Sequence, residues 1–145
     1  MKINFTKKQY KQLLNIAFLG NWTANSTRLP DEIHEEYHDI YQYICSFAKN
    51  FGYDNVITYD KKFDQYFPTL EFEEPLQPII DENDDRVFWE ELSNRLAKRD
   101  IAMTGEEFQT NDDYIEKLFK AKEKYEIEFG QNGIENLVIK ERTSK

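Results

Sequence analysis

The chain has 145 residues, 32% of them charged, and its 28 acidic and 19 basic residues give a formal net charge of −9. Nucleic acid and anionic membrane repel an acidic surface, so both are excluded as expected partners, whereas a basic protein suits it. The composition is 15% aromatic with only 5 Gly and 4 Pro, which indicates a packed, mainly helical fold and not a disordered chain.

Cysteine usage and hydropathy indicate the compartment. Cys45 is the single cysteine, and a lone thiol cannot form an internal disulfide, which favours a reducing environment. The N-terminal stretch lacks the apolar region of a signal peptide, and no apolar run approaches the ~20 residues that span a bilayer. We therefore expect a cytoplasmic protein without a membrane partner. The sequence does not determine its oligomeric state.

The first expected helix runs from about Lys7 to about Asn25. Thr6 and Gln9 have the spacing of a capping box, in which each side chain bonds the backbone of the other residue. Apolar residues occur on every side of this helix, which is typical of a helix that is buried on more than one side. The alternative is that one of its faces binds a partner.

The second expected helix runs from about Glu32 to Phe51, with Asp31 as its N-cap and Gly52 as its C-terminal stop. It carries the clearest helical periodicity of the chain. The predicted core stripe consists of Ile33, Tyr37, Ile40, Ile44, Phe47, Ala48 and Phe51.

An irregular stretch follows from Tyr53 to Asp81. We expect a short strand at Asn55–Tyr59, a helical turn at Lys62–Phe67, and extended chain at Glu71–Pro75 and Leu76–Ile80, because a residue before proline disfavours the helical conformation. The many aromatic residues of this stretch indicate that it packs onto the helices.

Two more helices are expected, from about Asp84 to Ala102 and from Asn111 or Asp112 to about Phe129. Residues Ile134–Ile139 alternate enough to predict a terminal strand, which could pair with a strand at Ile3–Phe5. The predicted fold is thus a mainly α, single-domain bundle of about four helices over residues 1–140. A small β element would join the two ends, and a polar tail would occupy residues 141–145.

Residues His34 to His38 read H-E-E-Y-H and match the H-E-x-x-H zinc signature of metalloproteases. On a helix, His34 and His38 would lie on one face and bind one zinc ion, while Glu35 would act as general base for the zinc-bound water. The motif gives an alternative function as a zinc-dependent hydrolase, with Glu35 as catalytic residue and His34 and His38 as metal ligands.

The surroundings of the motif favour a chance match. Glu32, Glu36 and Asp39 flank the histidines and make the surrounding surface solvated, and the chain contains no third histidine. Cys45 would lie ~10 Å beyond His38 at the rise of an α-helix, too far to share one ion. The main expectation is therefore no catalytic residue and no cofactor, with both histidines partly exposed beside carboxylates.

The sequence contains no phosphate-binding loop, no G-x-S-x-G and no C-x-x-C. Our first functional hypothesis is a non-enzymatic acidic binding protein, of the inhibitor or immunity type, that docks a basic protein. A ligand-binding bundle with a pocket beneath the aromatic middle stretch stays open as a further hypothesis. The expected contact region comprises two acidic clusters, Glu71, Glu73, Glu74 and Asp81, Glu82, Asp84, Asp85.

Three stretches of the chain, LGNW, FWEELSNRLAKRD and NGIENLVI, resemble small, acidic, uncharacterised bacterial proteins of similar length. The resemblance covers most of the chain. It implies a single domain, and it brings neither an activity nor site residues.

Overall fold

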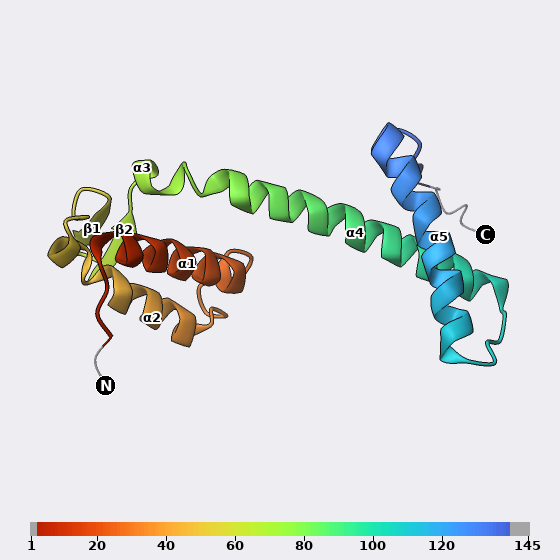
Figure 1. Ribbon diagram of the computed structural model, residues 1–145, viewed down its shortest axis with the longest axis horizontal. Coiled ribbons are helices and arrows are strands. Elements are labelled where there is room, and N and C mark those ends of the chain that lie inside the picture. The colour runs from red at the N-terminus through yellow and green to blue at the C-terminus, as the bar shows by residue number, and fades with distance from the viewer. Residues whose placement is uncertain (1–2, 140–145) are drawn as a thin grey trace. The chain divides into compact units, whose positions relative to one another are not determined.

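The computed structural model describes residues 3–139, which are mainly helical and include a small two-stranded antiparallel sheet (Figure 1). The predicted fold class is confirmed. The expected tail at residues 141–145 lies outside the described residues. In chain order the elements are α1 (Lys7–Asn25), α2 (Glu35–Cys45), the 3₁₀-helix η1 (Ala48–Phe51), β1 (Ile57–Asp60), β2 (Gln65–Pro68), α3 (Leu70–Glu73), α4 (Gln77–Thr104) and α5 (Asn111–Asn132).

The chain divides into two compact units, Met1–Asp81 and Glu82–Lys145, and each is described by itself. The boundary falls inside α4, since this helix begins at Gln77 and ends at Thr104. The composition and periodicity of the sequence do not predict a linker there. A continuous helix lacks the high Gly, Pro and Ser content that usually marks a domain boundary.

Helix α1 begins and ends where the sequence predicts. The Thr6 hydroxyl accepts a hydrogen bond from the Gln9 backbone N–H (3.2 Å), and the Gln9 side chain accepts one from the Thr6 backbone N–H (3.0 Å). The predicted capping box is therefore confirmed. The helix is not buried on all sides, however: Tyr10, Leu14 and Phe18 enter the core, whereas Ile16 is 68% exposed.

Helix α2 lies beside α1 in the opposite direction (Figure 1), with the Tyr10 hydroxyl donating to the Ile44 carbonyl at 2.7 Å. It is shorter than predicted, and its buried face is Tyr41 and Cys45. Tyr37 and Ile40 of the predicted stripe are about half exposed. The sequence offers two adjacent apolar stripes on this helix, and periodicity alone cannot choose the one that meets α1.

Both helices contribute to one core in the first unit, which also includes residues from η1, the β-hairpin, α3 and the start of α4. Its aromatic members pack edge to face, as with Phe18 and Phe72 at 5.5 Å between ring centroids. The buried residues are Tyr10, Leu14, Phe18, Tyr41, Cys45, Ala48, Val56, Ile57, Phe72, Leu76 and Ile80.

The connection from α1 to α2 is fixed by the side chain of Asn25, the last residue of α1. Its carbonyl oxygen accepts a hydrogen bond from the His34 backbone N–H (2.7 Å), and its amide donates to the His34 carbonyl (3.3 Å). The same amide donates to the Asn21 side chain at 2.9 Å. One side chain thus joins the end of α1 to the N-cap of α2.

Replacement of Asn25 by alanine is expected to lower the free energy of unfolding by about 1–3 kcal/mol, because the backbone N–H of His34 loses its partner and the His34 carbonyl loses one of its donors. Urea unfolding of the variant measures this loss. Asn21→Ala is the matched control, since it removes only the bond between the two side chains and should cost clearly less. Equal losses in the two variants would contradict the role assigned to Asn25.

The β element is a hairpin of β1 and β2, with Ile57 opposite Pro68 and Asp60 opposite Gln65. The strand predicted near Asn55–Tyr59 is thus confirmed in outline. The helical turn predicted at Lys62–Phe67 is wrong, because the Asp60 side chain accepts from the Lys62 backbone N–H (2.7 Å) and turns the chain back into β2.

The predicted pairing of the two termini is also wrong. Neither Ile3–Phe5 nor Ile134–Ile139 forms a strand in the structure. A segment with alternating apolar residues forms a strand only when the edge of another strand lies within hydrogen-bonding distance. In the β1–β2 hairpin, each strand pairs with the other, which is its neighbour along the chain.

The extended chain predicted around Pro75 and Pro78 is wrong as well. Residues Leu70–Glu73 form the short helix α3, and α4 begins at Gln77. Pro78 lies in the first turn of α4, where a missing backbone N–H costs no helical hydrogen bond. Helix α4 therefore starts seven residues before the position predicted, Asp84.

The second unit contains the greater part of α4 and all of α5. Thr110 caps α5 by accepting from the Asp113 backbone N–H (3.1 Å), one residue before the predicted cap. The rings of Trp89 and Phe129 pack at 5.4 Å between centroids and join the two helices. The buried residues of this unit are Ser93, Ala97, Ile101 and Phe129.

Candidate functional site

The two predicted acidic clusters are surface features. Glu71 of α3 and Glu74, its C-cap, are exposed and Glu73 is half-buried, while Phe72 enters the core. On α4 the residues Asp81, Glu82, Asp84 and Asp85 are all exposed.

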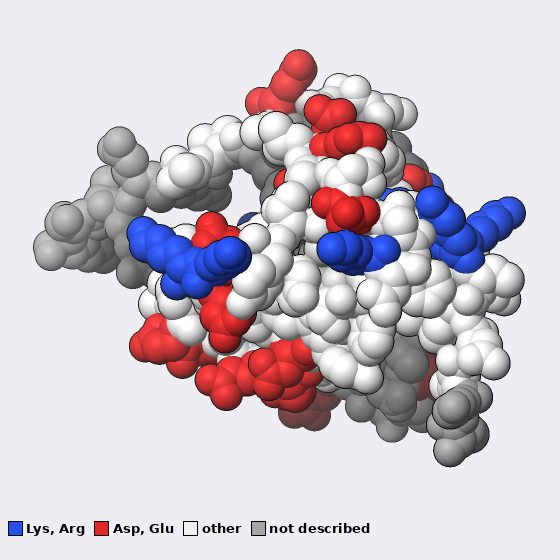
Figure 2. Space-filling model, turned by 90° about the vertical axis from the view of Figure 1, so that its left-hand side faces the viewer, with Lys and Arg blue, Asp and Glu red and all other residues white. Residues whose placement is uncertain are grey.

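Most carboxylates of the α4 cluster have a partner on their own helix. The Gln77 amide donates to Asp81 at 2.7 Å, and Arg86 forms an ion pair with Glu82 at 2.8 Å. The indole N–H of Trp89 donates to Asp85 at 3.0 Å. On the face drawn in Figure 2, acidic and basic side chains lie next to one another at several places. These clusters alone therefore do not define a binding site.

The two histidines of the H-E-x-x-H motif border different hollows of the first unit. His34 is the N-cap, with φ −76° and ψ 92°, and not a helical residue, because α2 begins at Glu35. His34 borders a recess against α1, whereas His38 borders a hollow shared with Tyr59, Asp64 and Tyr66. Neither hollow is lined by both histidines.

The surroundings of His34 match the expectation of contacts with carboxylates. Its Nδ1 lies 3.8 Å from Glu36 Oε1, and its ring packs edge-on against Tyr37 at 5.8 Å between centroids. Within residues 3–139, no group of three or more His, Cys, Asp or Glu side chains is arranged to hold a metal ion. Glu35, the alternative general base, is exposed.

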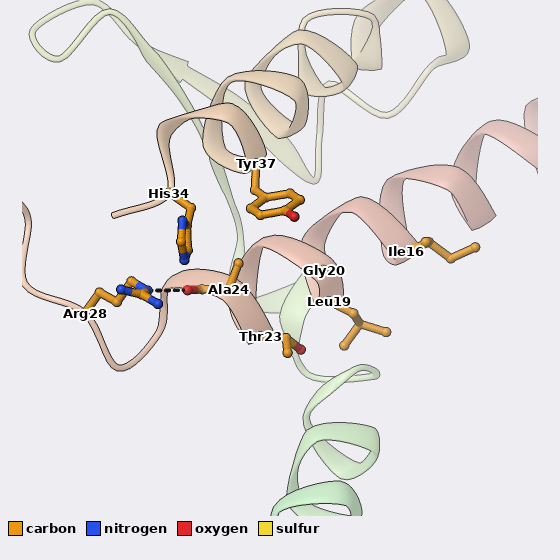
Figure 3. A pocket seen from close by; sticks show the side chains of 8 residues that line it. All are labelled: Ile16, Leu19, Gly20, Thr23, Ala24, Arg28, His34 and Tyr37. Atoms are coloured by element: carbon orange, nitrogen blue, oxygen red, sulfur yellow. Dashed lines mark hydrogen bonds between the residues drawn. The ribbon is translucent and has the colours of Figure 1, made fainter. Parts of the chain in front are cut away.

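An apolar hollow lies between α1 and α2, and we call it the α1–α2 recess. Figure 3 shows its α1 wall, with Gly20 in the middle, and Tyr37 and His34 at the start of α2 on the other side. It is open to solvent and has a volume of about 670 Å³. The lining residues are Ile16, Leu19, Gly20, Thr23, Ala24, Arg28, His34 and Tyr37.

The two edges of the recess differ in charge. The chain carries no charged residue from Gln12 to Thr27, so the α1 edge is uncharged. Between residues 28 and 39 there are five acidic residues and one basic residue, Arg28. The Arg28 guanidinium donates to the backbone carbonyls of Ala24 (2.9 Å) and Glu32 (3.5 Å), which places its charge at the end of the recess (Figure 3).

A second recess lies at the opposite end of the same helix pair and is more enclosed, with a volume of about 540 Å³. Leu13 of this recess lies one helical turn before Ile16, and Ile44 lies two turns after Tyr37, so both recesses occupy the same side of the pair. Its lining residues are Ile3, Asn4, Phe5, Tyr10, Leu13, Tyr43, Ile44, Phe47 and Phe51.

Cys45 is fully buried between two buried tyrosines of the core. Burial raises the pKa of its thiol from 9.0 to about 11, and burial also raises the pKa of Tyr10 and of Tyr41. A protonated and inaccessible thiol is a poor nucleophile. Cys45 is therefore a core residue.

In the second unit, Asp100 of α4 forms a polar cluster with α5. The Tyr125 hydroxyl donates to Asp100, Arg99 forms an ion pair with it at 2.7 Å, and Lys124 lies 3.8 Å away. The hydrogen bonds from Tyr125 and Arg99 lower the pKa of the Asp100 carboxyl. Arg99 also donates to the Tyr125 hydroxyl at 3.1 Å, so the cluster connects the two helices.

Comparisons of the sequence with models of known protein families, with curated proteins and with solved structures found no match. Within the part of the chain that the structure describes, no helix has the length and apolar character needed to cross a membrane.

The α1–α2 recess is a candidate site that lies outside the contact region predicted from the sequence, the two acidic clusters. A signal for it exists in the run from Gln12 to Thr27, which is uncharged and apolar on every side of its helix. That pattern predicts burial, or the alternative of a face that binds a partner, and the exposure of Ile16 and Tyr37 favours the alternative.

Proposed function

We propose that the chain is a non-enzymatic binding protein of the cytoplasm that docks a basic protein partner. The observation that carries the proposal is the α1–α2 recess, where Ile16 is 68% and Tyr37 50% exposed next to an acidic segment. Large apolar side chains that gather in an exposed recess are typical of a surface that binds another protein.

The charge of the chain supports the basic partner. Acidic residues outnumber basic ones across the whole sequence, and five of them lie between Asp31 and Asp39, the segment that contributes His34 and Tyr37 to the recess. Charges at the edge of an interface accelerate association with a partner of opposite sign, while apolar contacts at its centre supply most of the affinity. The recess supplies the apolar surface, and the acidic residues of the segment that enters α2 supply the charge.

Capture experiments on cell extract test the proposal. We expect immobilised protein to retain proteins of high isoelectric point at low salt and to release them as the salt concentration rises, because screening weakens charge attraction. Neutralising two carboxylates next to the recess, with Glu32→Gln and Glu36→Gln, is expected to slow association with a captured partner by ~10-fold at low salt.

Two further variants serve as controls for this prediction. Neutralising the α3 cluster (Glu71, Glu73, Glu74) or the α4 cluster (Asp81, Glu82, Asp84, Asp85) tests the contact region that the sequence predicts. Slower association in either one would place the contact there. If all three variants bound the partner as the wild type does, with unchanged salt dependence, the proposal of a charge-steered partner would be wrong.

A further inference from the structure

We propose that a second copy of this chain packs antiparallel against helix α4, along a surface that is complementary to itself. α4 is a continuous helix from Gln77 to Thr104 (Figure 1). The surface belongs to the second unit, so the inference does not depend on the proposed function, which concerns the α1–α2 recess.

Four residues of α4 form this surface, and we call them the α4 stripe. The α4 stripe consists of Asp85, Phe88, Leu92 and Arg95. They follow one another at intervals of three, four and three positions, which is the spacing at which two α-helices meet along a seam. Four positions further at each end, Asp81 and Arg99 continue the spacing, and the pattern then covers ~27 Å of helix.

The α4 stripe is open to solvent. Phe88 is 52% exposed and the Arg95 side chain 79% exposed, and Leu92 is half-buried. Ser93 and Ala97 are buried and lie on a different side of the helix, because each residue turns an α-helix by ~100°. Since the second unit pairs α4 with α5, these buried residues mark the side that α5 covers. A second helix can therefore reach the stripe.

Charge changes sign along the α4 stripe. Its first residue is acidic, the middle two are apolar and the last is basic. When a second α4 lies antiparallel across the middle of the stripe, Asp85 meets Arg95 of the copy and Phe88 meets Leu92 of the copy. Two-fold symmetry repeats each contact, as in any interface that uses the same patch on both partners. A second copy thus complements the stripe in both charge and apolar character.

Residues beyond the stripe extend the complementarity. In the same register, Asp81 meets Arg99 of the copy at the two ends of the pattern. Beside the stripe, Asp84 meets Lys98 of the copy, and both residues are exposed. Arg99 also forms an ion pair with Asp100 at 2.7 Å, so it shares its charge between two carboxylates. A parallel copy would instead bring acids to acids and bases to bases.

Two electrostatic effects oppose the arrangement. Glu91 borders the middle of the stripe and would lie near Glu91 of the copy, but Arg95 of its own helix forms an ion pair with it at 3.2 Å. In the dimer, Arg95 lies between this glutamate and Asp85 of the copy. The formal net charge of −9 also makes two copies repel. Ions screen that repulsion beyond ~8 Å at physiological ionic strength, so contacts at the stripe decide the outcome.

The contacts that stripe residues make on their own helix do not block the pairing. Asp85 accepts a hydrogen bond from the Trp89 indole at 3.0 Å, and a carboxylate has room for further donors. The exposed ion pair of Arg95 with Glu91 lies at i, i+4, a type of pair that contributes little stability. Both side chains can therefore bind the copy at small cost.

The small core of the second unit gives a physical reason for the dimer. Among the described residues of this unit, the buried ones are Ser93, Ala97, Ile101 and Phe129. Small helical units with so little buried apolar surface are often stabilised by association with another chain. Antiparallel packing of two α4 helices would cover Phe88 and Leu92 of both copies.

Sedimentation equilibrium of the full chain tests the inference. We expect a monomer–dimer equilibrium with a dissociation constant between ~1 µM and ~500 µM, because the interface is small. Two charge-swapped variants define the register. The first is Arg95→Glu with Lys98→Glu, and the second is Asp84→Lys with Asp85→Lys.

Each charge-swapped variant alone is expected to raise the dissociation constant at least ~10-fold, because like charges then face each other in the antiparallel dimer. The second variant is less negative than the wild type, so general repulsion between copies would predict the opposite. An equimolar mixture of the two variants restores all swapped pairs. It should therefore form a heterodimer at least as tight as the wild-type dimer.

The apolar part of the stripe has its own matched pair of variants. Phe88→Ala is expected to raise the dissociation constant ~10-fold, because the ring is the largest apolar group at the contact. Val87→Ala is the control, since Val87 is the adjacent residue and is 50% exposed but lies off the stripe. It should leave the dissociation constant unchanged. Circular dichroism should show the same helical content in all variants.

Several outcomes would overturn the inference. One is a wild-type chain that stays monomeric up to ~500 µM. Another is a dimer that both charge-swapped variants retain, which would place the contact elsewhere or make the helices parallel. A third is loss of the dimer in both variants without recovery in their mixture. The capture experiment on cell extract tests the proposed function separately, because it measures retention of other proteins.

Discussion

Replacement of Phe72 by alanine is expected to lower the free energy of unfolding of the first unit by about 3–5 kcal/mol. Phe72 is 1% exposed, packs edge to face against Phe18, and lies under the ammonium group of Lys11, whose Nζ is 3.8 Å from the ring centroid. The substitution removes the favourable free energy of burying the ring, and it leaves a cavity that the surrounding helices fill only in part.

Urea unfolding followed by tryptophan fluorescence measures this effect. The chain has 2 tryptophans, and Trp89→Phe leaves Trp22, which packs near Phe18 in the first unit at 6.2 Å between centroids. Leu70→Ala is the matched control, because Leu70 lies in the same short helix but is 73% exposed. It should change the stability by less than about 0.5 kcal/mol. A small effect of Phe72→Ala would show that α3 does not anchor the chain to the core.

Loss of stability above pH 9 is the second large effect that we expect. The Cys45 thiol has its pKa raised by burial to about 11, and burial raises the pKa of the neighbouring Tyr10 and Tyr41 hydroxyls. Below pH 9 all three groups are protonated in the folded and in the unfolded chain, so they make no contribution to the pH dependence.

The number of protons bound by the folded and the unfolded chain explains why the stability falls. As the pH rises through 9, the thiol of the unfolded chain loses its proton while the folded chain keeps it, so the unfolded chain binds fewer protons and the free energy of unfolding falls. One group accounts for about 1.4 kcal/mol per pH unit, so Cys45 contributes a loss of about 2–3 kcal/mol between pH 9 and its folded pKa. The two tyrosines steepen the fall above pH 10.

Urea unfolding at pH 7, 8, 9, 10 and 10.5 measures the dependence. Cys45→Ala is expected to be less stable at pH 7, because a buried side chain is shortened. Its free energy of unfolding should fall less between pH 9 and 10 than that of the wild type. An equal fall in both proteins over this interval would show that the thiol is not the group responsible.

Local chemistry explains which helical boundaries the sequence predicts well. Helix α1 begins after Thr6 because the capping box with Gln9 needs only neighbouring residues. Gly52, with φ 71°, ends η1 because glycine adopts the left-handed conformation at little cost. Where the signal depends on a more distant segment, as with the terminal strands expected at Ile3–Phe5 and Ile134–Ile139, the prediction is wrong.

The candidate site shows the same contrast. The H-E-x-x-H string is visible in the sequence, but only the structure shows that His34 is the N-cap of α2, with its backbone N–H bound by Asn25, and that His34 and His38 border different hollows. The acidic clusters are also visible, but their exposure does not distinguish a contact region from a solvated surface. Neither the H-E-x-x-H string nor the acidic clusters predict where the recess lies.

By itself, the sequence determined the helical class, the acidic charge and the boundaries that short-range capping sets. Tertiary structure decided which stripe of α2 is buried, since Tyr41 and Cys45 enter the core and leave Tyr37 outside. It thereby decided that Tyr37 meets Gly20 and Ile16 in a recess. The physical reason is that periodicity measures which residues share a face of one helix, whereas burial depends on which face the neighbouring helix covers.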